Sequence, residues 1–371
     1  MKLKVKRTVL LEALNNVSKA ISNKNIIPIL SGIKFDLFKD KLVITASDND
    51  ITIQTEIEKS DDLIIEKTGN IVIKGKYILD IVRKLEAEFI NIEIVDDHKI
   101  VIFTDNSQFN LNGIEAREYP DITLDLSEDF ITMKINEFKD MITETNYACS
   151  LDEARIVLTG VNLKIDNKTL ECSATDSYRL SLKKFNLKNG IKNSVDIIIP
   201  SKNLNELLKL MNSVEEEIEL HLFSNKIIFK FNNILFQSRL INGTYPNTKN
   251  LIPEDKLFEL TVSKNEFYSM VDRASILNDD SDNNIITLEI KDKVMKVTSM
   301  SLEIGKVEET MKVAVTDNIK ISFSAKYMMD ALRTIKSNNV IITFVGEIKP
   351  ILLKNDDNND LISLILPIRT Y

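Results

Sequence analysis

One sequence pattern occurs three times along the chain, and this repeat constrains the fold more than any other feature. Residues 75–85 (GKYILDIVRKL) return in similar form at 325–335 (AKYMMDALRTI) and more loosely at 201–211 (SKNLNELLKLM). In all three segments apolar residues recur at i, i+3, i+4 and i+7, which is the spacing of one apolar face on a short helix. The segments are followed, at intervals of 126 residues, by Tyr119, Tyr245 and Tyr371. We therefore predict three copies of one structural unit.

Each unit is itself doubled. The second half of each unit has a strand-like run, the helix and an alternating hairpin, most clearly at 218–222 and 227–231. The first half has the same order, with a strand and a helix predicted at 4–21, 134–147 and 261–275 and further strands at 32–37, 160–165 and 284–290. The predicted fold is therefore α+β, with three domains at 1–125, 126–252 and 253–371, each a doubled strand-helix-strands motif. Polar, proline-containing linkers at 120–129 and 246–256 separate the domains.

The net charge of the chain means that any DNA-binding surface must be confined to one part of it. The formal charge is −8, whereas a protein that coats nucleic acid is usually basic overall. The six predicted helices are nevertheless net positive together, and lysines occupy matching places at Lys76, Lys202 and Lys326. A basic set of helices on an acidic protein would form one lining that attracts phosphate. No base-reading motif is evident, so such contacts would not depend on DNA sequence.

Size decides how many domains could enclose DNA. A domain of about 120 residues has an equivalent diameter of roughly 35 Å, so three in a circle leave a hole of about 5 Å and six leave about 35 Å. Duplex DNA is roughly 20 Å across and fits only the larger hole. A chain of this kind that encircles DNA must therefore dimerise.

The sequence contains no pattern that predicts catalysis, a cofactor or a metal. Phosphate-binding glycine motifs and a nucleophile elbow are absent, and the chain has only nine glycines. His98 and His221 lie far apart in sequence, and we expect both at the surface. The acidic run 278–282 partly resembles a calcium loop, but Asn283 replaces the glycine of the sharp turn, so we predict a solvated loop.

Two further expectations concern compartment and thiols. There is no signal-peptide core and no apolar run long enough to span a membrane, which indicates a cytoplasmic protein. Cys149 and Cys172 are too few for a disulfide framework or a structural metal site, and we expect two buried thiols.

Three motifs resemble the bacterial sliding clamp family, the beta subunit of DNA polymerase III. They are IPILSG at 27–32, ATDSYRLS at 174–181 and LPIR at 366–369, and the likeness extends in order over the entire chain. The resemblance implies a head-to-tail homodimer, a six-domain ring with helices lining the hole and sheets outside. It implies a non-catalytic processivity factor for the replicative polymerase. The clamp loader and repair proteins would bind the same ring through short peptide motifs.

The resemblance also assigns site residues. For DNA it implies Lys24, Lys76 and Lys202 with Arg155 of the loop 152–157, and the repeat adds Lys326. For the dimer it implies that Phe109 and Leu111 of one chain face Ile276 and Leu277 of the other. For the partner peptide it implies an apolar pocket between the second and third domains, formed by Leu158, Thr175, Ser177, Tyr178, Arg179, Leu180, Pro246, Asn250, Leu251, Leu364, Ile365, Leu366, Pro367, Ile368 and Arg369.

Two departures and two alternatives accompany this interpretation. Tyr178 stands where many relatives have His, and Asn250 where some have Arg, so peptide preference is expected to differ. Without the resemblance, residues 364–368 would equally be read as a final core strand. The alternative function is a monomeric three-domain adaptor that binds peptides and never touches DNA.

Overall fold

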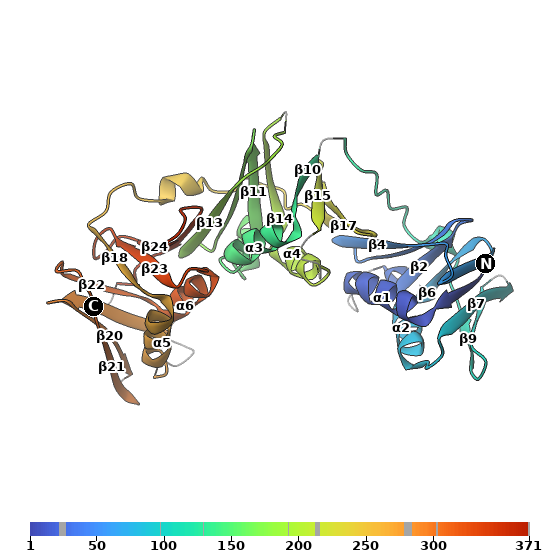
Figure 1. Cartoon of the computed structure of the whole chain (residues 1–371), viewed down its shortest axis with the longest axis horizontal. Helices are drawn as coiled ribbons and strands as arrows, with labels where there is room; N and C mark the ends of the chain where they lie inside the picture. Colours follow the sequence, from blue (N-terminus) through green and yellow to red (C-terminus); the bar gives the residue numbers. More distant parts are fainter. Residues whose placement is uncertain are drawn as a thin grey trace. The chain divides into compact units, whose positions relative to one another are not determined.

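The computed structural model describes residues 1–21, 27–96, 98–128, 130–191, 193–211, 216–277, 284–301 and 303–369 (Figure 1). The predicted helices and strands are present in all three repeats. In the first repeat the elements are β1 (Lys2–Lys6), α1 (Arg7–Val17), β2 (Gly32–Leu37), β3 (Lys41–Ser47), β4 (Ile51–Glu58), β5 (Leu63–Lys67), β6 (Gly69–Lys74), α2 (Gly75–Lys84), β7 (Phe89–Asp96), β8 (Lys99–Phe103) and β9 (Gln108–Asn112).

The other two repeats follow the same order without an equivalent of β5. The second contains β10 (Phe130–Lys134), α3 (Ile135–Asn146), β11 (Gly160–Asp166), β12 (Thr169–Thr175), β13 (Arg179–Asn186), β14 (Val195–Pro200), α4 (Ser201–Leu208), β15 (Glu217–Leu222), β16 (Lys226–Phe231) and β17 (Ile234–Arg239). The third contains β18 (Phe258–Ser263), α5 (Lys264–Ala274), β19 (Ile285–Lys291), β20 (Val294–Ser301), β21 (Gly305–Lys312), β22 (Ile319–Ser324), α6 (Ala325–Thr334), β23 (Asn339–Phe344), β24 (Ile351–Asn355) and β25 (Leu361–Ile365).

The strands of each repeat form two antiparallel blocks. The terminal block joins the first strand to the last three, as in β18-β23-β24-β25, and the central block joins the four strands between, as in β21-β20-β19-β22. Blocks from different repeats then pair edge to edge. Strand β17 pairs with β4, and β13 pairs with β25, so that two eight-stranded sheets cross repeat boundaries.

These sheets lie in two compact units. One unit comprises residues 1–136 and 202–240, and the other comprises 137–201 and 241–371, so the second repeat contributes to both. Helices α1 and α2 contact each other in the first unit, and α5 and α6 do so in the second (Figure 1).

The repeated helix is built as its apolar spacing predicts. In α6 the residues Met328, Ala331 and Leu332 are fully buried, as is Ile335 just after the helix. The hydroxyl of Ser324 accepts a hydrogen bond from the amide of Tyr327 and caps the first turn. The apolar face of the helix therefore packs into the core of the third repeat, and its polar face is left for other contacts.

One expectation about the histidines is wrong. His221 is 2% exposed, with Nδ1 2.9 Å from the carbonyl oxygen of Ser127 and Nε2 3.0 Å from a carboxylate oxygen of Glu219. The ring of Phe130 on the neighbouring strand covers it, with ring centroids 4.9 Å apart. Because both ring nitrogens have partners, burial leaves no unsatisfied polar atom. His98 is half-buried, with Nε2 3.3 Å from Glu115.

The expectation of two buried thiols is confirmed. Cys149 and Cys172 are both free and buried, and burial raises the pKa of each thiol to about 12. Among the described residues, no helix has the length and apolarity needed to cross a membrane. The acidic run 278–282 lies outside the described residues.

Candidate functional site

A tight turn between β12 and β13 organises the centre of the predicted peptide site. The hydroxyl of Thr175 donates to the carbonyl of Arg179 at 2.6 Å and accepts from the amide of Ser177 at 3.1 Å. One carboxylate oxygen of Asp176 accepts from the amides of Tyr178 and Arg179, both at 2.9 Å. Ser177 has a φ of +79°, which short polar residues adopt more readily than bulky ones. The turn holds the Tyr178 side chain outward, 63% exposed.

Two apolar clusters adjoin this turn. In the first, Leu158, Ile198 and Tyr245 pack together, and the Tyr245 hydroxyl accepts a hydrogen bond from the Thr175 amide at 3.0 Å. The second consists of Leu180, Leu352 and Leu364 with Ile252 and Ile362 against it. The predicted site residues on η4 (Glu153–Thr159), β12, β13 and β25 are therefore brought together.

The last described residues complete this surface. The amide of Leu366 donates to the carbonyl of Tyr178 at 2.9 Å, so the segment after β25 runs beside the turn. Tyr178, Leu251 and Leu366 are large apolar side chains that remain exposed. Pro246, Asn250 and Arg369 are exposed, Pro367 and Ile368 are half-buried, and Ile365 is buried. We call Tyr178, Leu251 and Leu366 the apolar patch.

The side chain of Arg179 is held in place by contacts within the chain. Its guanidinium pairs with Asp176 at 3.0 Å and Asp330 at 2.8 Å, and its side chain is only 10% exposed. It also lies over the rings of Tyr327, at 4.4 Å, and Tyr147, at 5.4 Å. A charge with two carboxylates and two aromatic faces is well satisfied. Arg179 therefore attaches β13 to α6, and its predicted contact with a peptide stays a prediction.

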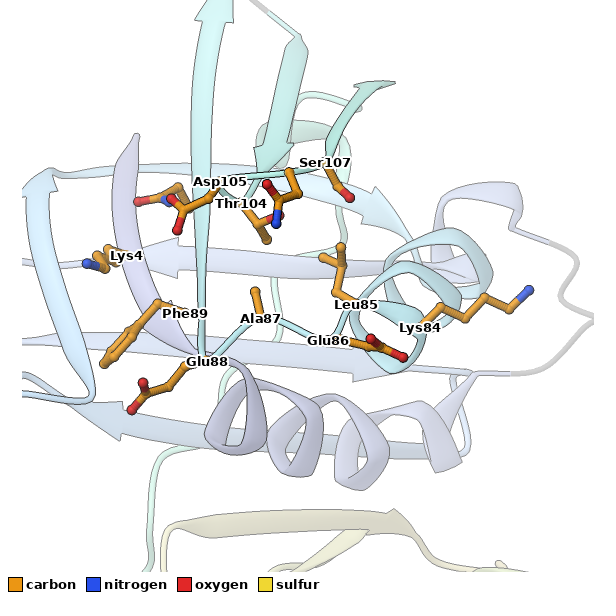
Figure 2. A pocket seen from close by; sticks show the side chains of 12 residues that line it. Lys4, Lys84, Leu85, Glu86, Ala87, Glu88, Phe89, Thr104, Asp105 and Ser107 are labelled. Atoms are coloured by element: carbon orange, nitrogen blue, oxygen red, sulfur yellow. The ribbon is translucent and has the colours of Figure 1, made fainter.

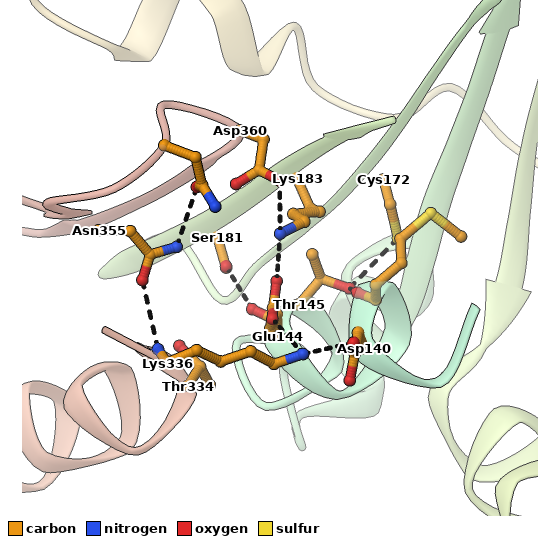
Figure 3. A network of polar contacts seen from close by, with 12 residues as sticks. Asp140, Glu144, Thr145, Cys172, Ser181, Lys183, Thr334, Lys336, Asn355 and Asp360 are labelled. Atoms are coloured by element: carbon orange, nitrogen blue, oxygen red, sulfur yellow. Dashed lines mark hydrogen bonds and ion pairs between the residues drawn. The ribbon is translucent and has the colours of Figure 1, made fainter. Parts of the chain in front are cut away.

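An ionic network centred on the buried carboxylate of Glu144 lies near the contact between β13 and α6 (Figure 3). Glu144 of α3 is 2% exposed and contacts the ammonium of Lys183 at 2.7 Å and that of Lys336 at 3.3 Å. Lys183 also contacts Asp360 at 2.9 Å, and Lys336 contacts Asp140. Burial disfavours the charged form of Lys183, but the hydrogen bonds to Glu144 and Asp360 outweigh it and raise the pKa. The network binds α3 to the strands and loops of the third repeat.

The predicted DNA-contacting cations differ in their surroundings. Lys76 on α2 and Lys326 on α6 are exposed. Lys202 on α4 is exposed too, but its ammonium pairs with Asp50. Arg155 donates to the Ser177 hydroxyl at 3.0 Å, at the turn of the predicted peptide site. Lys24 lies outside the described residues.

The predicted dimer residues lie on one edge strand and after a helix that contacts another edge strand. Phe109 and Leu111 lie on β9, the last strand of its sheet. Ile276 and Leu277 follow α5, which contacts β21 at the edge of another sheet. Phe109 is 37% exposed and Ile276 is 72% exposed. Large apolar side chains at a sheet edge are unfavourable in water unless another surface covers them.

A hollow of about 680 Å³ lies near β9, in the first repeat (Figure 2). Its lining comes from Lys4, from Lys84 at the end of α2 and residues 85–89 that follow it, from Asn91 and from the hairpin loop 104–107. Lys84, Glu86, Glu88 and Asp105 give it charges of both signs. It shares no residue with the apolar patch.

Comparisons with known proteins agree over the full chain. Sequence profiles of the DNA polymerase III beta subunit match residues 1–125 (N-terminal domain), 132–247 (central domain) and 249–369 (C-terminal domain). The beta sliding clamp of Staphylococcus aureus strain N315 is 39% identical and that of Staphylococcus epidermidis strain ATCC 12228 is 38% identical, each covering 100% of both chains. The chain belongs to the beta sliding clamp family.

Solved sliding clamps share its fold. The crystal structure of the clamp from Bacillus subtilis has a TM-score of 0.96 at 36% identity, and the beta chain from Streptococcus pneumoniae has 0.95 at 31%, each covering 100% of both chains. The predicted α+β class with three DNA-clamp domains is confirmed. The domain boundaries after residues 125 and 252 stay predictions.

Sequence reasoning missed several residues of this clamp's site. Tyr245 was noticed only as a repeat marker, yet it fixes Thr175. Asp330 and Tyr327 belong to the repeated helix motif, and their conjunction with Arg179 was not foreseen. Leu352 gave no signal, because a buried leucine in a strand looks like any core residue.

Proposed function

We propose that this chain is a DNA sliding clamp. Two copies join head to tail into a six-domain ring around duplex DNA, and the ring tethers the replicative polymerase. The clamp loader and repair proteins bind the same ring through short peptides at the apolar patch. The protein acts in the cytoplasm and performs no chemistry of its own.

The observation that carries this proposal is the pair of open strand edges, β9 and β21. Three equivalent hydrogen bonds fix the alignment of the repeats: the amides of Ile114, Ile241 and Ile368, spaced by 127 residues, donate to the carbonyls of Val72, Ile198 and Ser322. By this alignment β9 is equivalent to β17 and β25, while β21 is equivalent to β4 and β13. Inside the chain β17 pairs with β4, and β25 pairs with β13. Repetition of the same pairing joins β9 of one copy to β21 of another.

Burial supports the same pairing. Phe236 and Ser363 are the equivalents of Phe109, and both are 0% exposed because a strand of another repeat lies beside them. Phe109 is 37% exposed. An edge that is covered twice within the chain is left uncovered the third time, and a second copy supplies the cover.

Side chains indicate the same neighbours. The apolar residues Phe138, Met141 and Ile142 of α3 match Phe267, Met270 and Val271 of α5, so Tyr147 is equivalent to Ile276. Inside the chain the hydroxyl of Tyr147 contacts the hydroxyl of Ser363 at 3.0 Å. Because Ile276 is equivalent to Tyr147 and Phe109 is equivalent to Ser363, the same contact between two copies brings Ile276 against Phe109 of the partner copy. This is the pairing that the family resemblance implied.

Topological retention on DNA tests the function. The clamp, loaded on closed circular DNA by its clamp loader, should stay bound through gel filtration and should leave when the DNA is cut once. Retention depends on closure of the ring around the DNA and not on tight contacts. If the ends of the cut DNA are blocked, the clamp should therefore stay bound. Equal retention on linear DNA with free ends would contradict a ring.

Peptide binding tests the apolar patch. A Leu366→Asp variant should bind the clamp-binding peptide of the replicative polymerase at least about tenfold more weakly, because a carboxylate replaces a desolvated apolar contact. Ile348→Asp, at a position that is 66% exposed and outside the patch, is the matched control and should bind normally. Isothermal titration with the isolated peptide measures both. Unchanged binding by Leu366→Asp would remove this surface from the proposal.

A further inference from the structure

We propose that the junction between two copies carries a charge-inverted counterpart of the network around Glu144. Arg273 of one copy pairs with Glu86 of the other. The inference rests on the proposed ring and adds to it a device that selects the correct partner edge.

The internal junction sets the pattern. Glu144 lies between two lysines, one from its own repeat and one from the next (Figure 3). Lys183 on β13 is the lysine of its own repeat, at 2.7 Å. Lys336, just after α6 of the third repeat, is the lysine across the junction, at 3.3 Å. The Glu144 side chain is 2% exposed and that of Lys183 is 12% exposed, whereas that of Lys336 is 54% exposed, so this is a triad around a buried acid with the signs + − +.

Half of the inverted network is already present in the third repeat. The alignment of α3 with α5 places Arg273 at the position of Glu144. The alignment of β13 with β21, followed through the strand pairs Ser173↔Leu182 and Thr298↔Glu308, places Glu309 at the position of Lys183. Arg273 and Glu309 form a two-fold hydrogen-bonded pair, at 3.0 and 2.7 Å. The acidic and basic members have exchanged places.

The other half lies on the first repeat. Helices α2 and α6 begin at Gly75 and Ala325, and each ends one residue before a buried apolar residue, Leu85 or Ile335. Glu86 is therefore equivalent to Lys336. Glu86 is exposed and projects from the segment after α2, at the hollow near β9 (Figure 2). A second copy joined through β21 would bring Arg273 to Glu86 and complete a triad with the signs − + −.

Exposure agrees with a missing partner. The Arg273 side chain is 53% exposed, although its equivalent Glu144 is 2% exposed. Glu144 has one ion-pair contact from its own repeat and one from the next, whereas the ion pair of Arg273 is with Glu309 of its own repeat.

The junction between the first and second repeats is neutral at the equivalent positions. There Asn16 corresponds to Glu144, and Thr55 corresponds to Lys183. The six junctions of the ring would thus be of three kinds, each present twice, with three different charge patterns on one backbone plan. A partner edge placed at the wrong junction brings like charges together, for example Glu86 against Glu144. Specificity of this kind depends on repulsion in the wrong pairing as well as attraction in the right one.

A charge-exchange series tests the pair. Glu86→Lys should raise the dimer dissociation constant at least about tenfold, because its ammonium faces Arg273 of the partner. Glu86 is exposed, so this substitution should leave the fold intact, as circular dichroism can verify. In a triple variant, Arg273→Glu and Glu309→Lys are added to Glu86→Lys. The ion pair within the chain is then kept with its charges exchanged, and the glutamate at position 273 faces the lysine at position 86 of the partner. The triple variant should return to within about threefold of the original constant.

Glu88→Lys is the matched control, with the same charge change two residues away and an expected shift of less than about threefold. Sedimentation over a concentration series at 150 mM salt measures all variants. An equal effect of Glu88→Lys, or no recovery in the triple variant, would overturn the Arg273–Glu86 pair while the original chain still dimerises. A monomeric original chain would instead refute the ring itself.

Discussion

The edge between β13 and β25 is closed within the chain, whereas the equivalent edges of β21 and β9 have no second neighbour among the described strands. Across the closed junction Leu180 packs with Leu364, Tyr147 meets Ser363, and Glu144 is buried against two lysines. At the open edges Phe109 on β9 and Ile276 after α5 remain exposed. The closed junction is assembled within one chain. Two separate chains need apolar area to offset the entropy of association, and charge then selects the partner.

Among the variants that distinguish the open edges from the closed junction, loss of the apolar contact at the open edges should have the largest effect. Ile276→Asp with Leu277→Asp should raise the dimer dissociation constant more than about 100-fold, since two carboxylates would enter a desolvated contact. Sedimentation at micromolar concentration should find a monomer of 42.3 kDa. Ile348→Asp should remain dimeric, and a dimeric Ile276→Asp/Leu277→Asp variant would show that these residues do not join the chains.

Removal of Glu144 should weaken the closed junction without opening the ring. Glu144→Ala leaves Lys183 with Asp360 and Lys336 with Asp140, so we expect a loss of about 2 kcal/mol in the free energy of unfolding. Urea unfolding measures the loss, with Glu153→Ala at an exposed position as the control. A change in dimer affinity larger than about threefold would mean that the two kinds of junction are not independent.

The Tyr147 hydroxyl should contribute less. Tyr147→Phe removes the hydroxyl that lies 3.0 Å from the Ser363 hydroxyl, and should lower the free energy of unfolding by about 1 kcal/mol. Ser363→Ala should cost a similar amount, and the double variant should cost no more than either alone. Full additivity in this urea double-mutant cycle would indicate that the two hydroxyls do not interact.

The smallest effect that we expect is the loss of stabilisation by Lys183 at alkaline pH. The pKa of Lys183 is raised in the folded chain above its ordinary value of 10.5. Its stabilisation is therefore complete below pH 10.5 and is lost as the pH rises through the higher folded-state pKa. The stability difference between the original chain and Lys183→Met should shrink only above that pH. A difference that shrank between pH 7 and 9 would contradict the raised pKa.

Much of the fold could be predicted because the same pattern of apolar residues occurs three times in the sequence. The apolar spacing of α2, α4 and α6, the doubled motif and the three domains are all present. The edge pairings could not be predicted, since strand periodicity shows which face is buried and not which strand is adjacent. His221 was misplaced for a related reason: its partners, Ser127 and Phe130, come from another part of the chain.

The candidate site was predicted unevenly. Leu180 and Leu364 are together because their strands, β13 and β25, are paired, and Leu158 packs in a separate cluster with Ile198 and Tyr245. Arg179 is tied to Asp330, 151 residues away, and no local pattern reports a contact of that range. The charge exchange between Glu144 and Arg273 becomes visible only after the repeats are aligned through the strand pairs.

A cross-link between β9 and β21 tests head-to-tail closure most directly. Inside the chain Leu364 faces Leu180 and Gln237 faces Thr52, and the same register places Asn110 of one copy opposite Lys306 of the other. Cys149 and Cys172 are buried and should not interfere. Under mild oxidation Asn110→Cys/Lys306→Cys should form a covalent dimer that survives denaturing electrophoresis and is retained on closed circular DNA. A chain that stays monomeric, or that cross-links equally well when Cys replaces Val307 instead of Lys306, would contradict this closure.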